Sequence, residues 1–351
     1  MHPTVQSMPW LIDAWRFVEG SLRAGRLSHA LLIMGERGVG KQALAESLAH
    51  LLVCEQLELS NSPSGADSQS GLAPCGHCKQ CELVAAASHP DVRRYAPEKS
   101  RMIKVNQIRE LSAFAVSSPQ VAKRKIILVD RADQLNINAA NALLKTLEEP
   151  SEDVVLLLLQ ESGRPILPTL RSRCQSVTIA TPDAQAGLAW LVQQTESESV
   201  EEGPSEDQCR RALTLAGAAP RLALEYLTGD FLAQRQDAFE AFRRFMKSEL
   251  SVAEAAKPFK TLGLEGTLWL MECWAADLAR LAAGGTASDP DTADMLRYLA
   301  TLNPPWRVHA LLQLFQESRS AGIYNVSPEL EAERLLIAWQ DFMPAKKRRA
   351  S

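Results

Sequence analysis

The stretch ALLIMGERGVGK, residues 30–41, decides the fold, because it joins an apolar strand to a glycine loop that ends in a lysine. Strand, glycine loop and lysine in this order are the layout of a phosphate-binding loop, G-x-x-x-x-G-K-[ST]. The last position of that motif carries a hydroxyl that holds Mg²⁺, and here it is Gln42. The stretch therefore predicts a nucleotide-binding fold from which one metal ligand is missing.

Four residues of this loop are the candidates for phosphate binding: Gly35, Gly38, Gly40 and Lys41. The lysine would reach the β and γ phosphates, and the backbone amides of residues 38–41 would cradle them at a helix N-terminus. Glycine-rich loops also occur as tight turns that bind nothing, and Gln42 keeps that alternative open. The sequence leaves the binding of ATP undecided.

A second apolar run, residues 126–130, ends in Asp130. In ATPases of this architecture such an acid holds Mg²⁺. ATPase families with Asp-Glu at this point use the glutamate to activate the attacking water, whereas the next residue here is Arg131. Because a cation cannot act as a general base at neutral pH, Gln42 and Arg131 together predict little or no ATP hydrolysis by this chain.

Strands and helices alternate in the first half of the chain, and helical patterns alone follow. The continuous apolar runs at residues 30–34, 126–130 and 154–159 are typical of buried parallel strands. They predict a doubly wound α/β domain that ends near Thr181-Pro182. The second half consists of amphipathic helices, separated by the polar stretches Thr195–Gln208 and Gly284–Asp291.

Size and composition narrow the class of protein. A chain of 351 residues is expected to form two or three domains, and its 46% hydrophobic and 23% charged residues are ordinary for a soluble protein. The net charge of −4 does not mark a nucleic-acid binder. Neither a long apolar run nor a signal-peptide pattern is present, which predicts a cytoplasmic chain without a membrane contact. The basic tail, residues 346–351, is either a solvated terminus or a contact for DNA phosphates.

Four of the seven cysteines form a candidate metal site. Cys75, Cys78 and Cys81 have the spacing C-x-x-C-x-x-C, and Cys54 precedes them across the polar segment Ser60–Gly71. Four thiolates suit a closed, tetrahedral, structural Zn²⁺ site, although His77 lies inside the knuckle and could compete. The alternatives are incidental thiols and an iron–sulfur cluster, but the C-x₃-C-P element of a ferredoxin is absent.

A third feature is the loop PTLRSRC, residues 168–174, after the third apolar run. An arginine in such a loop can stabilise γ-phosphate charge in a neighbour's site, an effect worth roughly 10³–10⁵ in rate. Two solvated arginines are the plainer interpretation of the loop taken alone.

Together these residues resemble the delta-prime family of bacterial DNA polymerase III clamp-loader subunits, which are AAA+ proteins. The most specific matches are the four-cysteine insertion, the string NALLKTLEEP at residues 141–150, and Ser172-Arg173-Cys174. The resemblance runs from Pro9-Trp10-Leu11 to residues 334–339 and is weakest in the C-terminal third.

The resemblance implies an α/β AAA+ domain over residues 1–181 with a zinc module at residues 54–81. A small helical lid (182–227) and an all-α collar (228–345) would follow. Arg173 would be an arginine finger acting in trans, the four cysteines zinc ligands, and Arg221 the lid arginine that senses nucleotide. Gamma/tau-like motor subunits and a delta-like subunit would complete a five-membered ring that loads the sliding clamp onto primed DNA.

Two other functions stay open at this point. The chain could be a motor subunit that hydrolyses ATP itself, which Gln42 and Arg131 argue against. It could also be a zinc-dependent DNA-binding module, although only Lys79, Arg93 and Arg94 supply positive charge near the cysteines.

Overall fold

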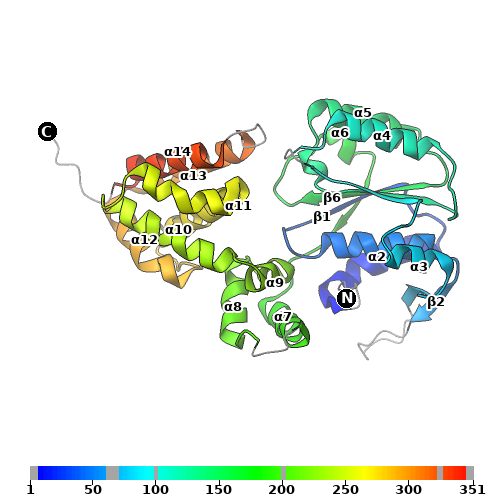
Figure 1. The fold of residues 1–351 in the computed structure, drawn as a ribbon, viewed down its shortest axis with the longest axis horizontal. Coiled ribbons are helices and arrows are strands. Elements are labelled where there is room, and N and C mark those ends of the chain that lie inside the picture. Colours follow the sequence, from blue (N-terminus) through cyan, green and yellow to red (C-terminus); the bar gives the residue numbers. More distant parts are fainter. Residues whose placement is uncertain (1–6, 61–70, 99–101, 199–202, 322–326, 345–351) are drawn as a thin grey trace. The chain divides into compact units, whose positions relative to one another are not determined.

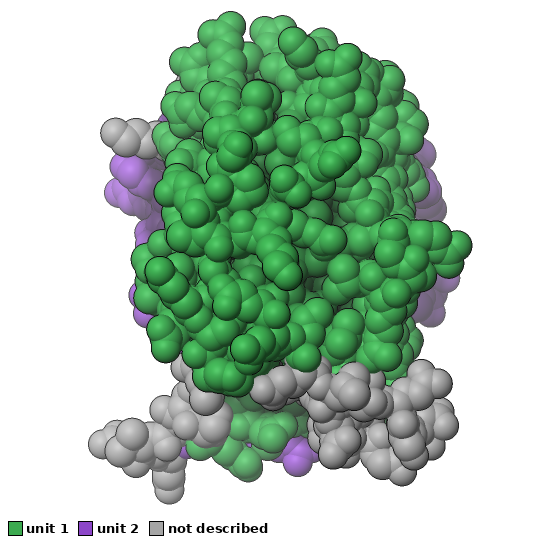
Figure 2. Space-filling model, turned by 90° about the vertical axis from the view of Figure 1, so that its right-hand side faces the viewer, with its two compact units in different colours: residues 1–197, 218–222 green, residues 198–217, 223–351 purple. Residues whose placement is uncertain are grey.

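The computed structural model describes residues 7–60, 71–98, 102–198, 203–321 and 327–344. Two compact units make up the chain: Met1–Ser197 with Ala218–Leu222, and Glu198–Gly217 with Ala223–Ser351 (Figures 1 and 2). Most of the polar segment between Ser60 and Gly71, and the basic tail at residues 346–351, lie outside the described residues.

A five-stranded parallel sheet forms the centre of the first unit. Its strands are β1 (Ala30–Gly35), β4 (Val92–Tyr95), β5 (Lys125–Val129), β6 (Val154–Glu161) and β7 (Gln175–Thr178), in the order β4-β5-β6-β1-β7. The three apolar runs predicted as parallel strands correspond to β1, β5 and β6. Because β1 lies between strands that come later in the chain, its carboxyl end is where ligands bind in open α/β sheets.

Helices cover both faces of this sheet (Figure 1). On one face lie α4 (Val105–Val116) and α5 (Ile137–Glu148), whose apolar sides meet β5 and β6 in one buried core. On the other face lies α2 (Lys41–Val53), with α3 (Lys79–Ala85) beside it. The side chain of Asn136 caps α5 by accepting the Ala139 N–H at 2.7 Å, and Pro150 follows soon after its end.

The remaining elements of the first unit are shorter or peripheral. The turn η2 (Pro9–Leu11) leads into α1 (Ile12–Arg23), and η3 (Ala132–Gln134) follows β5. A small antiparallel hairpin, β2 (Leu57–Ser60) with β3 (Gly71–Pro74), precedes α3. After β6 the chain forms α6 (Pro168–Arg171), and after β7 it forms α7 (Ala184–Glu198).

In the part of the remaining chain that the structure describes, helices are the only regular elements, as predicted. They are α8 (Glu206–Leu215), α9 (Pro220–Thr228), α10 (Phe231–Met246), α11 (Val252–Ala282), α12 (Pro290–Leu302), α13 (Pro305–Ala321) and α14 (Pro328–Phe342). The predicted loop Thr195–Gln208 is shorter than expected. The Thr195 hydroxyl bonds back to the Leu191 and Val192 carbonyls inside α7, and Ser205 caps α8 through a capping box with Gln208.

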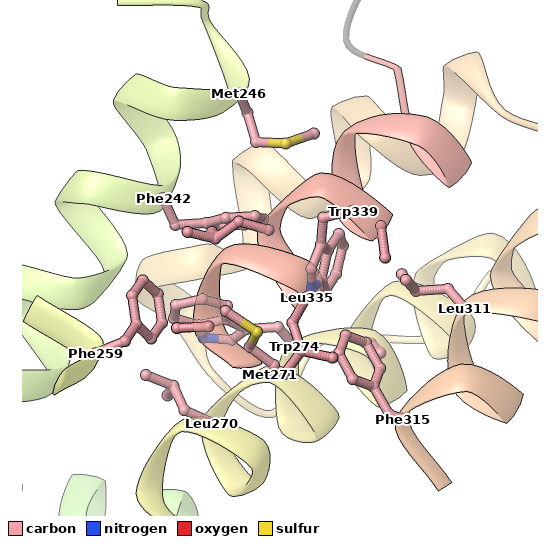
Figure 3. Close-up of a cluster of buried hydrophobic side chains, with 14 of the residues drawn as sticks. Phe242, Met246, Phe259, Leu270, Met271, Trp274, Leu311, Phe315, Leu335 and Trp339 are labelled. Carbon is pink, nitrogen blue, oxygen red and sulfur yellow. The ribbon is translucent and has the colours of Figure 1, made fainter. Parts of the chain in front are cut away.

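An aromatic cluster holds α10, α11 and α14 together (Figure 3). The Phe242 ring stacks on Trp274 at a centroid distance of 4.9 Å and meets Trp339 edge-on at 5.0 Å. All three side chains are fully buried, and each buries on the order of 150–250 Å². Among the described residues, none of the helices combines the length and apolar character needed to cross a bilayer.

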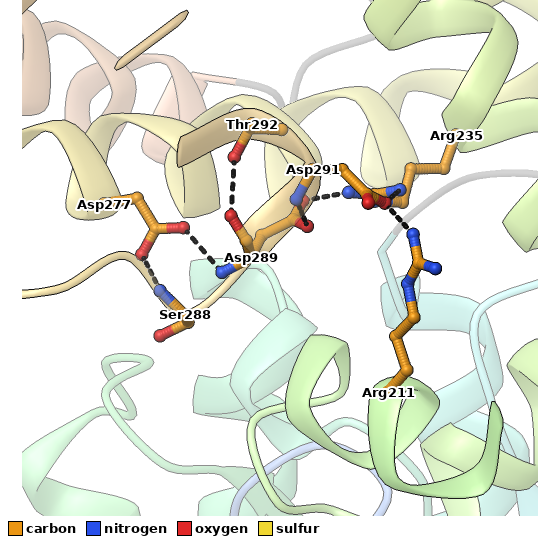
Figure 4. A network of polar contacts seen from close by, with 7 residues as sticks. All are labelled: Arg211, Arg235, Asp277, Ser288, Asp289, Asp291 and Thr292. Atoms are coloured by element: carbon orange, nitrogen blue, oxygen red, sulfur yellow. Dashed lines mark hydrogen bonds and ion pairs between the residues drawn. The ribbon is translucent and has the colours of Figure 1, made fainter. Parts of the chain in front are cut away.

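A buried ion network joins four helices of the second unit (Figure 4). Arg235 of α10 is 3% exposed and forms ion pairs with Asp289 and, at 3.3 Å, with Asp291 at the start of α12. Arg211 of α8 reaches the same Asp291 carboxylate. On α11, the Asp277 carboxylate accepts the backbone N–H groups of residues 288 and 289 at 2.8 and 3.2 Å.

The substitution Arg235→Ala should destabilise the helical unit by about 3–5 kcal/mol, because it leaves the Asp289 carboxylate buried without its counter-ion. Denaturant unfolding monitored by helical circular dichroism measures this loss. The matched control is Arg297→Ala on α12, which removes a solvent-exposed pair with Asp294 and should change stability by less than about 1 kcal/mol. Equal losses in the two variants would contradict the buried-charge explanation.

Candidate functional site

The four predicted metal-binding cysteines lie together. Cys54 follows the end of α2, Cys75 and Cys78 lie between β3 and α3, and Cys81 is on α3. Five of the sulfur–sulfur distances run from 3.5 to 4.0 Å. A tetrahedral ion with ligand bonds of about 2.3 Å places its sulfurs about 3.8 Å apart. The cluster therefore fits one ion with four thiolate ligands.

The turn around this centre leaves His77 outside the ligand set. Gly76 has a φ of 77°, which lets the chain turn between Cys75 and Cys78. The exposed His77 ring bonds the Cys75 carbonyl through Nδ1 at 2.8 Å, and within the described part of the chain the cluster consists of the four cysteines alone. All four sulfurs lie within 4.8 Å of one another. An iron–sulfur cluster would place several irons and sulfides between them and needs a wider spacing.

A buried polar chain connects the cysteine cluster to the sheet. Gln80 of α3 donates through Nε2 to Glu55 at 2.9 Å and to the Val121 carbonyl at 3.0 Å. His89 Nε2 bonds the Gln80 amide oxygen at 2.8 Å, while its Nδ1 accepts the Asp91 backbone N–H. This pairing assigns the proton to Nε2 and fixes the orientation of the imidazole ring.

Asp91 completes this chain by holding the loop that precedes β5. Its carboxylate accepts the backbone N–H groups of residues 120–122 at 2.7–2.8 Å. Burial alone would raise the pKa of Asp91, but these three donors hold the pKa below its usual value. His89 and Asp91 therefore have a structural explanation: they attach the cysteine module to the sheet.

The predicted phosphate loop is also formed. Gly38 and Gly40 have φ values of 77° and 103°, and Gly40 is the N-cap of α2. The Lys41 ammonium donates to the Gly35 and Glu36 carbonyls of its own loop at 2.8 and 2.7 Å. Burial lowers the pKa of Lys41, against the opposing effect of nearby acids. Gly35, Gly38, Gly40 and Lys41 thus lie together, with the lysine bonded within the loop.

The start of α9 packs directly on this loop. The Arg221 backbone N–H donates to the Gly38 carbonyl at 3.1 Å. A Cβ added at Gly38 would lie 2.4 Å from the Leu222 Cβ, so only glycine fits this contact. The backbone of the predicted sensor Arg221 therefore touches the phosphate loop.

Protein side chains surround Asp130, the acid predicted to hold Mg²⁺. Arg94 of β4 donates through Nε to Asp130 Oδ2 at 2.8 Å, and its Nη2 contacts the same oxygen. Its Nη1 lies 3.4 Å from Glu46 of α2, and the Gln42 side-chain amide donates to the same Glu46 oxygen at 2.7 Å. Arg131 follows with a left-handed φ of 53°. Mg²⁺ prefers a near-octahedral shell of oxygens, and these residues do not fit it.

Sequence reasoning missed Arg94 and Glu46 as members of this site. From the sequence alone, Arg94 counts only as positive charge near the cysteines. The signal that could have found it is the arginine pair just before Tyr95, on a strand that precedes the one ending in Asp130. Parallel strands that are neighbours bring their carboxyl ends together, as β4 and β5 do here.

Arg173 lies in the turn after α6 and is partly exposed. Its Nη1 donates to the Thr169 carbonyl at 2.9 Å, and its Nη2 pairs with Glu148 at the end of α5 at 2.6 Å. The side chains of Arg173 and Glu148 are 36% and 48% exposed. The guanidinium is therefore held by its own chain and still reaches solvent, where an anion of another molecule could approach it.

A parallel sheet with a phosphate loop after β1, a cluster of four cysteines that could hold a metal ion, and a helical second unit are the arrangement expected of an AAA+ protein with a cysteine insertion. Residues 12–183 match the family described as "DNA polymerase III, delta subunit". Over 338 aligned residues the chain is 32% identical to DNA polymerase III subunit delta' of Pseudomonas aeruginosa. This alignment covers 94% of this chain and 96% of that protein.

A second relative agrees. Over 234 aligned residues the chain is 36% identical to DNA polymerase III subunit delta' of Escherichia coli. This alignment covers 66% of this chain and 64% of that protein. The chain belongs to the DNA polymerase III delta-prime family, which confirms the resemblance predicted from its sequence.

Proposed function

We propose that this chain is a clamp-loader subunit of DNA replication that does not hydrolyse ATP itself. It supplies Arg173 in trans to ATP held by a neighbouring subunit. One contrast carries the proposal: Arg173 is intact and solvent-accessible, whereas the chain's own two nucleotide motifs have Gln42 and Arg131 where a metal ligand and a base would be. Family membership supports a role in the same complex as the relatives.

Its proposed partners are gamma/tau-like motor subunits and a delta-like subunit in a five-membered ring. The ring would act on the sliding clamp and contact primed DNA as an assembled complex, in the cytoplasm. Residues 182–227 would be the lid and residues 228–345 the collar through which the subunits join. A DNA polymerase activity would belong to the holoenzyme, because this chain's sequence contains no recognisable polymerase constellation.

The proposed cofactor is one structural Zn²⁺ held by Cys54, Cys75, Cys78 and Cys81. The sulfur–sulfur distances support a closed tetrahedral shell, as does the lack of a fifth ligand in the cluster among the described residues. Such an ion would stabilise the turn before α3 and supply no reactive water.

A zinc-dependent DNA-binding module has less support. Arg93 lies over the Phe114 ring at 4.2 Å, and Arg94 is paired with Asp130. Two of the three basic residues near the cysteines are thus engaged within the chain and contribute little to a phosphate-binding surface.

The test uses the wild-type chain and Lys41→Met in the reconstituted complex. Lys41 is the residue that an active phosphate loop cannot lose, so a non-hydrolysing subunit should tolerate its substitution with ATP turnover of the complex unchanged. Steady-state phosphate release measures the turnover, and the melting temperature of the variant controls for folding. Loss of turnover in a folded variant, or turnover by the isolated wild-type chain, would show a motor subunit instead.

A further inference from the structure

We propose that Arg94 takes the place of the divalent metal, so that this chain excludes Mg²⁺ from its nucleotide site. The inference deepens the proposed function, on which it rests. It assigns the loss of metal binding to a residue outside both nucleotide motifs, in addition to Gln42 and Arg131.

The Arg94 guanidinium lies between the end of β5 and the first turns of α2, the two elements that carry Asp130 and Gln42. Arg94 Nε and Nη2 both contact Oδ2 of Asp130, the acid at the end of β5. On the other side, Arg94 Nη1 faces Glu46, one turn along α2 from Gln42. The same Glu46 oxygen accepts the Gln42 amide. Asp130 and Gln42, at the two positions that hold Mg²⁺ in active relatives of this loop, are therefore linked through Arg94 and Glu46.

The charges explain why the metal would be excluded. A guanidinium is protonated at every physiological pH, so Asp130 is neutralised without an ion. A divalent cation that approached the same carboxylate would meet a fixed positive charge a few ångströms away. It would also find an amide at position 42 in place of the hydroxyl that normally completes its shell.

Restoring the hydroxyl alone should not restore metal binding. The Gln42→Thr variant supplies the missing ligand but leaves Arg94 on Asp130. The double variant Gln42→Thr/Arg94→Thr supplies the hydroxyl and frees the carboxylate. Only the double variant is expected to bind ATP more tightly with Mg²⁺ than without it.

The experiment is calorimetric titration of ATP into the isolated full-length chain, once with Mg²⁺ and once with EDTA. The wild type and Gln42→Thr should give no difference between the two conditions. The double variant should bind on the order of tenfold more tightly with Mg²⁺, which corresponds to about 1.4 kcal/mol. Melting temperatures identify any variant that has not folded, and Arg93→Thr/Gln42→Thr is the matched control for removing a basic residue from β4.

Three results would overturn the proposal: tighter binding of ATP with Mg²⁺ by the wild type, the same gain in Gln42→Thr alone, or no Mg²⁺ dependence in a folded double variant. These outcomes are separate from the proposed function, whose test is turnover in the complex with Lys41→Met. The Arg94 proposal can therefore fail while the chain remains a non-hydrolysing subunit.

Discussion

Arg173→Ala should lower ATP hydrolysis at the adjoining motor subunit's site by on the order of 10³–10⁵-fold, while the variant chain stays folded. The guanidinium is the group that would neutralise charge on the γ-phosphate as the bond breaks. Its contacts with Glu148 and the Thr169 carbonyl lie near the surface, so their loss should cost little stability.

Single-turnover hydrolysis in the reconstituted complex measures this effect. Only the site beside this chain should be affected, so steady-state turnover would fall to what the remaining sites supply. The matched control is Arg171→Ala, two residues away at the end of α6 and exposed. Equal effects of the two substitutions would indicate a general charge contribution and would remove Arg173 from the mechanism.

Arg173→Lys separates charge from geometry. Lysine keeps the positive charge but cannot form the two parallel bonds of a guanidinium with phosphate oxygens. A rate near that of Arg173→Ala would support a directional contact with the γ-phosphate. A near-wild-type rate would mean that charge near the neighbouring site is sufficient.

The central strands could be predicted from the sequence, and the edge strands could not. β1, β5 and β6 are buried on both faces and therefore read as continuous apolar runs. β4 contains two exposed arginines, and in β7 only Val177 is buried. An edge strand pairs with one neighbouring strand only, and more of its side chains reach solvent. Its run of apolar residues is therefore short or absent, and for this reason β4 and β7 were missed.

Some parts of the candidate site could be predicted from the sequence, and others could not. The cysteine cluster and the phosphate loop depend on local spacing, which the sequence contains directly. The pairs Arg94–Asp130 and Arg173–Glu148 join residues brought together by the sheet order and by the packing of α5 against α6. Residue types alone did not identify these partners, because the contacts follow from the tertiary fold.

Cys78→Ser should abolish the bound metal and destabilise the cysteine module. A serine hydroxyl stays protonated at neutral pH and is a poor zinc ligand, so three thiolates remain in a shell built for four. In isolated zinc-finger peptides the metal contributes about 10–16 kcal/mol. We expect metal content, measured by mass spectrometry of the purified chain, to fall from about one ion per chain to near zero.

The matched control is Cys174→Ser. Burial raises the pKa of the Cys174 thiol to about 11, so this thiol stays protonated at neutral pH and should hold no metal. Its substitution should leave the metal content unchanged. Retention of one ion by Cys78→Ser would contradict the four-thiolate site, and iron in place of zinc would change the identity of the ion while keeping the shell.

The unfolding caused by Cys78→Ser should stay within the cysteine module, the segment that carries Cys54, Cys75, Cys78 and Cys81. Asp91 lies outside the cysteine-bearing segment and holds the backbone of residues 120–122 through bonds that involve no metal. The sheet should therefore stay folded in Cys78→Ser while β3 and α3, which bear three of the cysteines or flank them, open and become sensitive to protease. Because Arg173 lies outside the module, the variant should still support ATP turnover in the complex below its melting temperature. Loss of turnover in a variant with an intact sheet would indicate that the module contacts a partner and is more than a structural support.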